Sequence, residues 1–217
     1  MSRFEPPPGI NLPRGRVTDA LVAVIFVTAV LQLVTVIAAA VAGFGFMPFF
    51  VVAGQWQTDP LRVAVSPLVS QFLLSSVVMT LFNTILMLIV GRYVEKSIGP
   101  VGLIATFVAG AYGGALARLA LTPHSFLMTA DASAGLFALV GAYLTLYGVP
   151  YILPVPRHYG RFAQIGALAG FWIVLQVAFM LASGVFELSL TVVNPLGGLI
   201  AGMMVARPLL RLRYRKA

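Results

Sequence analysis

The sequence has no cysteine and very few charged residues. Of its 217 residues only 9% are charged, whereas 60% are hydrophobic. The absence of cysteine excludes disulfide bonds, thiolate nucleophiles and cysteine-ligated metal sites. About a quarter of the residues of a soluble domain are charged, so this chain has too few polar side chains to cover a surface that faces water. The composition, with a mean hydropathy of +0.99, predicts an integral membrane protein.

Acidic residues are scarcer still, six against fourteen basic ones, which gives a formal net charge of +8. In so apolar a chain, a positive-inside bias of the loops explains this charge better than a nucleic-acid partner does. The N-terminal stretch has no apolar core and no small-residue cleavage site, so we expect no signal peptide.

The apolar segments predict six membrane-spanning helices. Lipid offers backbone groups no hydrogen-bond partner, so each span must be a helix of about 20 residues. Charges, glycines and prolines separate the spans, which we place at 20–42, 67–90, 100–121, 132–149, 162–184 and 192–206. The last is short, and we expect its helix either to continue past Pro208 or to lean into the bundle.

The basic residues predict the orientation of this bundle. All of them except Arg62 and Arg118 fall on the side that holds both termini, which places both termini in the cytoplasm. The expected organisation is an N-terminal tail at 1–19, a six-helix membrane domain at 20–206 and a basic tail at 207–217. We expect a multi-pass protein of a bacterial inner membrane.

The first outer loop and the glycine spacing suggest how the bundle is built. "GFGFMPFFVV" combines phenylalanines with helix breakers, and Trp56 follows, so we expect an interfacial loop or a simple membrane anchor. Small residues four apart on one helical face let helices approach closely in lipid. The residues that fit this role are Gly110, Gly114, Gly166, Gly170, Gly197, Gly198 and Gly202.

Three segments resemble the rhomboid family of intramembrane serine proteases. "TLFNTILMLIVGRYVEKSIGPVGLIATFVAG" resembles its second span, the G-R-x-V-E-x-x-x-G turn and the start of its third span. "DASAGLFALVGAY" resembles the segment that carries the nucleophile, and "PLGGLIAGMMVA" resembles the H-L-G-G-x-x-x-G run of the sixth span. The likeness extends from about residue 20 to residue 206 and implies an all-α, six-helix rhomboid-like bundle.

The resemblance also implies where catalytic residues should lie, and several positions depart from the pattern. Ser133 falls on the nucleophile and Asn83 on an asparagine that helps to hold the oxyanion. The histidine paired with that asparagine is replaced by Met79, and the catalytic histidine is replaced by Pro195. Phe137 occupies the aromatic position that packs against the catalytic histidine in the family.

No base for Ser133 is evident. A serine hydroxyl is a poor nucleophile unless an adjacent group removes its proton. His158 lies in an inner loop across the membrane, and His124, nine residues before Ser133, is expected to be a solvated loop residue. We therefore expect Ser133 and Asp131 to serve as helix caps and Pro195 to occupy the first turn of the last span.

Three functions remain open. The first is a rhomboid-like pseudoprotease that engages the transmembrane helices of client or partner proteins in a binding, regulatory or scaffold role. The second is an accessory structural subunit of a larger inner-membrane complex. The third is an active serine endopeptidase that uses Ser133 with an unidentified base. Membrane lipid and a transmembrane protein are the expected partners, and no nucleic acid, cofactor or metal is expected.

One buried charge is also expected to find a partner. Arg118 lies about one turn inside the outer end of its span, where an unpaired guanidinium is costly unless it snorkels to the headgroups. Asp131 opens the next span after a short connection, so we predict an Arg118–Asp131 ion pair. Glu187 is the alternative partner.

Overall fold

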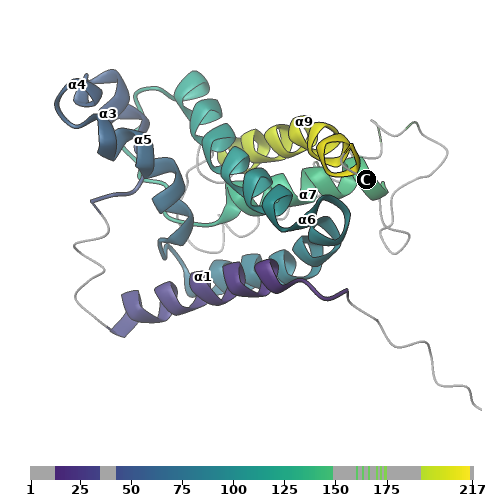
Figure 1. The fold of residues 1–217 in the computed structure, drawn as a ribbon. Coiled ribbons are helices and arrows are strands. Elements are labelled where there is room, and N and C mark those ends of the chain that lie inside the picture. Colours follow the sequence, from purple (N-terminus) through teal and green to yellow (C-terminus); the bar gives the residue numbers. More distant parts are fainter. Residues whose placement is uncertain are drawn as a thin grey trace, which may run out of the picture.

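The computed structural model describes residues 13–34, 43–148 and 192–215, together with residues 160, 163, 166, 170, 172 and 174. The elements of this part are all helical, apart from one isolated bridge between Phe46 and Thr129. In chain order (Figure 1) they are α1 (Arg16–Val34), α3 (Pro48–Val52), α4 (Gln55–Thr58), α5 (Pro60–Val69), the 3-10 turn η1 (Ser70–Phe72), α6 (Val77–Leu121), α7 (Ser133–Tyr147) and α9 (Asn194–Tyr214).

Helix α6 contains most of two predicted spans, joined at a kink. Gly99 has φ 80° and ψ 174° inside the helix, a left-handed conformation that glycine adopts without steric cost. Pro100 follows and suits the first turn of the second half. The prediction that the second span begins at residue 67 is wrong, because Pro67 lies in α5 and the chain leaves helical geometry at Leu73 before α6 begins.

Three of the described helices, α1, α6 and α9, are long and apolar enough to cross a membrane, and α7 is a shorter apolar helix. Helix α9 continues through Pro208 to Tyr214, as expected for the last span. Most of the span predicted at 162–184 lies outside the described residues, so six spans and the orientation of the termini stay predictions.

The first loop is folded into short helices rather than extended chain. Helices α3, α4 and α5 gather at one end of the molecule (Figure 1). The Phe49 amide donates to the Ser125 carbonyl at 3.3 Å, and the Phe49 and Phe126 rings lie 4.2 Å apart. The loop is therefore fastened to the α6–α7 connection. Trp56 on α4 is 55% exposed. Its location at the membrane interface stays a prediction.

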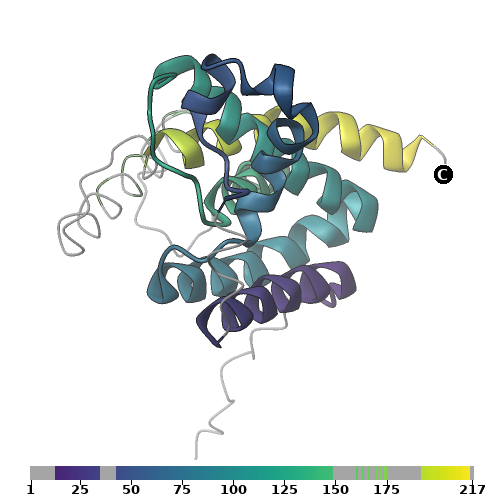
Figure 2. The same ribbon diagram turned by 90° about the vertical axis from the view of Figure 1, so that its left-hand side faces the viewer.

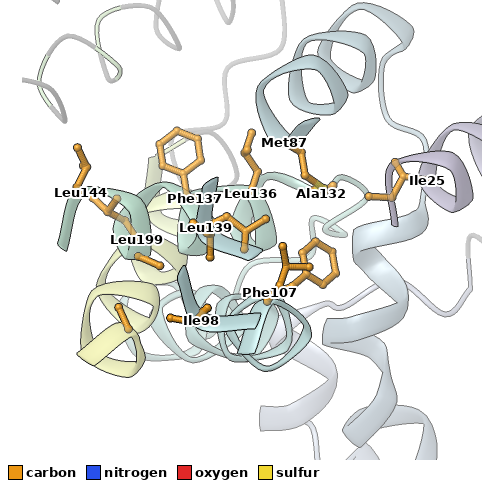
Figure 3. Close-up of a cluster of buried hydrophobic side chains, with 14 residues drawn as sticks. Ile25, Met87, Ile98, Phe107, Ala132, Leu136, Phe137, Leu139, Leu144 and Leu199 are labelled. Atoms are coloured by element: carbon orange, nitrogen blue, oxygen red, sulfur yellow. The ribbon is translucent and has the colours of Figure 1, made fainter. Parts of the chain in front are cut away.

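Helix α7 lies at the centre of the core. Ten of its fifteen residues are buried, and its side chains pack with those of α6, α9 and Ile25 of α1 (Figure 3). The α7–α9 contact brings backbone against backbone. A Cβ added at Gly198 would lie 2.1 Å from the Ala134 carbonyl oxygen, and one at Gly202 would lie 1.9 Å from that of Ala138. Neither position has room for a side chain.

The other glycines of the predicted packing set divide into two groups. A Cβ at Gly110 would lie 2.6 Å from the Ala134 oxygen, one at Gly114 would lie 2.8 Å from the backbone oxygen of Asn194, and one at Gly197 would lie 2.5 Å from that of Gly113. A Cβ at Gly166 or Gly170 meets no atom within 4 Å among the described residues. Most of the segment around them lies outside those residues, so their packing role stays a prediction.

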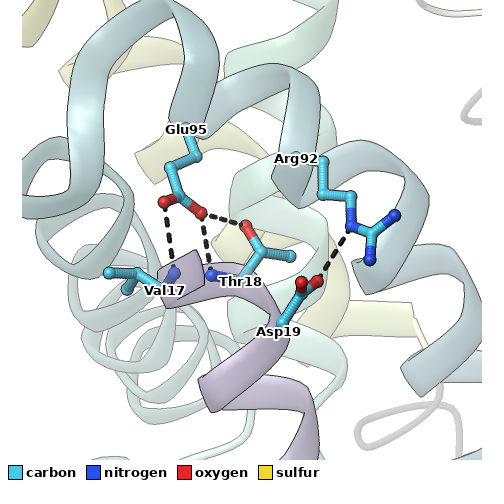
Figure 4. A network of polar contacts seen from close by, with 5 residues as sticks. All are labelled: Val17, Thr18, Asp19, Arg92 and Glu95. Atoms are coloured by element: carbon cyan, nitrogen blue, oxygen red, sulfur yellow. Dashed lines mark hydrogen bonds and ion pairs between the residues drawn. The ribbon is translucent and has the colours of Figure 1, made fainter. Parts of the chain in front are cut away.

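Helix α1 is fastened to the first half of α6 by polar contacts (Figures 2 and 4). The Glu95 carboxylate accepts the Val17 amide at 3.1 Å, the Thr18 amide at 2.8 Å and the Thr18 hydroxyl at 2.7 Å. Arg92 Nε also donates to Asp19 Oδ1 at 2.8 Å. Amides at a helix start need such acceptors, so a carboxylate from α6 caps α1 and fixes its position.

The α7–α9 contact can be tested by adding one methyl group. Gly202→Ala should lower the free energy of unfolding by about 1–3 kcal/mol, because the methyl group would overlap a backbone carbonyl that cannot move without separating two helices. Thermal unfolding in detergent measures the loss. Gly166→Ala is the matched control and should leave stability unchanged or slightly raised, since its Cβ has open space. Equal effects of the two substitutions would contradict the packing described here.

Candidate functional site

Ser133 is the first residue of α7, and its side chain is already bonded on both sides. The residue is 2% exposed. Its hydroxyl donates to Asp131 Oδ1 at 2.5 Å and accepts a hydrogen bond from Asn194 Nδ2 at 3.1 Å. Among the described residues, none of the bonds of this hydroxyl goes to a histidine. Of the titratable groups in the described part of the chain, the Asp131 carboxyl is the one bonded to it.

Asp131, and not Ser133, caps α7. The same Asp131 Oδ1 accepts the Ser133 amide at 3.1 Å, which satisfies one of the free amides at the helix start. The expectation that Ser133 caps the helix is wrong in this respect, because Ser133 is already helical and its hydroxyl points to the Asp131 and Asn194 side chains. Asp131 thus holds both the backbone and the hydroxyl of the residue at the nucleophile position.

Gln71 satisfies a second amide of the same helix start. Its Oε1 accepts the Gly135 amide at 2.9 Å, and its Nε2 donates to the Pro67 carbonyl at 3.3 Å. Gln71 is 1% exposed and belongs to η1. Sequence reasoning missed it, because a prediction that starts the second span at residue 67 makes Gln71 an ordinary span residue. The sequence signals that mark a helix start lie within a few residues of that start, whereas Gln71 is 64 residues from the amide that it accepts.

Asn194 is another site residue that the sequence did not single out. It begins α9, is 2% exposed and is wedged against α6, where a Cβ at Gly114 would lie 2.5 Å from its Oδ1. Pro195 follows it within the first turn of α9, as expected. Proline lacks both an amide hydrogen and a polar side chain. The position that carries a histidine in the resemblance therefore offers no proton acceptor, and the amide of Asn194 reaches Ser133 instead.

A polar side chain of α6 lies buried without a partner. Asn83 is 2% exposed, and neither its Nδ2 nor its Oδ1 makes a hydrogen bond in the described structure. The buried Nε1 of Trp172 is likewise without a partner. The Trp172 ring stacks on Phe82 at 5.4 Å and packs on Phe137 at 4.6 Å. Leaving such groups unsatisfied costs about 1–3 kcal/mol each, so they are the buried polar atoms of the described residues that still require a partner.

The remaining candidates for a base lie elsewhere. His124 is exposed in the connection between α6 and α7, and Met79 is half-buried in the first turn of α6. His158 and Glu187 lie outside the described residues. Within the described part of the chain, no group of three or more metal-ligating side chains is present.

Arg118 is fully buried and organises the connection that leads to Asp131. It donates to the Thr129 hydroxyl, to Ser125 Oγ at 3.2 Å and to the Leu127 carbonyl at 2.8 Å. Its charge also attracts the Asp131 carboxylate. The hydrogen bonds that the structure shows for Arg118 thus fasten the residues just before Asp131, and a direct Arg118–Asp131 pair stays a prediction.

A double-mutant cycle tests whether these two charges act together. Asp131→Asn should lower the unfolding temperature in detergent, because it weakens the cap of α7 and removes the attraction to Arg118. In an Arg118→Gln background the same substitution should cost less. Losses that add to within about 0.5 kcal/mol would mean that the two residues act independently, and the pair would be ruled out.

Comparison with known proteins identifies the fold family. A model of the rhomboid domain matches residues 62–212. No curated protein shows significant similarity to the chain. The match covers α6, α7 and most of α9, the helices that carry Asn83, Ser133 and Pro195. Together with the apolar helices, it marks a multi-pass membrane protein. Because the matched region spans well over half of the 217 residues, the chain belongs to the rhomboid family.

Proposed function

We propose that this protein is a rhomboid pseudoprotease that binds transmembrane helices without cleaving them. The observation that carries the proposal is the state of Ser133. Its hydroxyl donates to Asp131, accepts from Asn194 and lies beside a helix start where proline stands at the histidine position. General-base catalysis requires a side chain that can accept and release a proton near neutral pH. An aspartate that also accepts the backbone amide of the same serine is a structural acceptor.

The amides near Ser133 support the same conclusion. Acyl-transfer enzymes stabilise an oxyanion with backbone N–H groups aimed at the reacting carbonyl. Here the Ser133 amide donates to Asp131 and the Gly135 amide donates to Gln71. A peptide carbonyl would have to displace side chains of the protein itself to reach either donor. These contacts stabilise the folded site at the expense of binding a transition state.

Helix binding is supported by the buried polar groups that have no hydrogen-bond partner among the described residues. Asn83 offers a donor and an acceptor, and Trp172 offers a donor, in an otherwise apolar interior. A transmembrane helix of a client, entering between the second and fifth spans, carries hydroxyl or carbonyl groups able to pair with them. Interhelical hydrogen bonds of this kind contribute about 0.6–2 kcal/mol in membranes, enough to favour some helices over others without covalent chemistry.

The first test concerns reactivity. A fluorophosphonate probe should label the purified protein no more than it labels Ser133→Ala, because no base activates the hydroxyl. In-gel fluorescence with an active serine hydrolase as positive control gives the measurement. Labelling that disappears in Ser133→Ala would overturn the proposal and favour an active endopeptidase, with Asp131 or His124 as the base to examine next.

The second test concerns binding. A photo-crosslinking amino acid at Leu81 or Ile85, exposed on α6, should capture single-span membrane proteins in cells. The matched control is Met204, which is 71% exposed on α9 and should capture few. Capture at equal yield from both helices would indicate random collision in the membrane. One stoichiometric partner that also co-purifies in mild detergent would favour the accessory-subunit function instead.

A further inference from the structure

Two arginines in the last turns of α9 and one directly after its end are spaced four residues apart. Arg207, Arg211 and Arg215 are all exposed. An α-helix has 3.6 residues per turn and rises about 1.5 Å per residue, so side chains four apart lie above one another on one face at intervals of about 6 Å. The three guanidinium groups therefore form a continuous strip along the helix, called here the arginine stripe.

The opposite face of the same turns is fixed to the protein. Leu209 and Leu210 pack against the hydrophobic core. Arg213 Nη1 donates to the Lys96 carbonyl at 2.7 Å and to the Glu95 carbonyl at 3.4 Å, just before the kink of α6. With about 100° between successive residues, Leu209 and Arg213 lie about 160° around the helix from Arg211, the middle of the stripe. Leu210 lies about 100° from it, at the edge of the packed face. The stripe consequently faces outward from the bundle on a rigid support.

The chain has no free carboxylate in its described part to neutralise the stripe. The acidic side chains there have other partners: Asp19 binds Arg92, Asp59 accepts the Arg62 amide, Glu95 caps α1 and Asp131 binds Ser133. The sequence has only six acidic residues against fourteen basic ones. No carboxylate in the described part of the chain is therefore available as counter-charge for the three guanidinium groups.

We propose that Arg207, Arg211 and Arg215 bind the phosphate groups of anionic phospholipids. Arg207 and Arg211 lie in the last two turns of α9, a helix long enough to cross a membrane, and Arg215 directly follows it, so the stripe is expected at the level of the headgroups. Leu212 and Tyr214, 60% and 61% exposed, flank it and suit the interface between lipid and water. A planar guanidinium can take two phosphate oxygens at once, and basic residues beside a spanning helix attract anionic lipids.

Native mass spectrometry of the full chain in mild detergent tests this proposal. Titration with phosphatidylglycerol should give binding about tenfold tighter than titration with phosphatidylcholine of the same acyl chains. The triple variant Arg207→Gln, Arg211→Gln, Arg215→Gln should reduce this preference to below about threefold. Because none of the three side chains is buried, its unfolding temperature in detergent should match that of the unmodified chain.

A charge-matched control separates the stripe from net charge. Arg14, Arg16 and Lys96 are also exposed, and replacing all three by glutamine removes the same charge while leaving the lipid preference intact. Equal loss in both triple variants, or no loss in the stripe variant, would overturn the proposal. Inorganic phosphate at millimolar concentration should add no mass. If it binds as well as phosphatidylglycerol does, the stripe recognises free anions and the assignment to lipid is wrong.

Discussion

The backbones of α7 and α9 touch where Gly198 and Gly202 face Ala134 and Ala138, and the arrangement of the site depends on this contact. Lipid is as apolar as leucine, so helices in a membrane associate through close packing rather than through escape from water. Two glycines one turn apart allow that packing along the first half of α7. The same approach brings Asn194 within 3.1 Å of the Ser133 hydroxyl. A small-residue interface therefore determines which side chain faces the serine.

Hydrogen-bond satisfaction at helix ends is the second constraint. Water is scarce in the membrane, so free amides and carbonyls must find partners within the protein. Distant side chains supply them here: Glu95 serves α1, Gln71 serves α7 and Arg213 serves the carbonyls before the kink of α6. Each of these contacts also joins two elements far apart in sequence. Asn83 is the contrast, since its buried amide is left without such a partner in the described structure.

The sequence predicted the parts of this structure that local patterns encode. The Gly99–Pro100 break, the α7 segment, the continuation of α9 past Pro208 and the close glycines of α6 and α9 all follow from punctuation or spacing. The start of α6 could not be predicted in this way, because apolar composition does not distinguish the short loop helix that contains Pro67 from a membrane span. Gln71 and Asn194 were missed because their roles arise from contacts 61 or more residues away. Gly166 and Gly170 show the converse, a local pattern without a partner helix among the described residues.

The bonds of Ser133 also bear on what a histidine at position 195 could achieve. Under the proposed function, a Pro195→His substitution would not by itself free Ser133 for catalysis. The serine proton already points to Asp131, while the amides of Ser133 and Gly135 already donate to Asp131 and Gln71. Each of these acceptors also stabilises the start of α7, so removing one to free the serine would loosen the helix that carries it. The contacts that hold the start of α7 thus occupy the same groups that hydrolysis would require, and a single substitution would release only one of them.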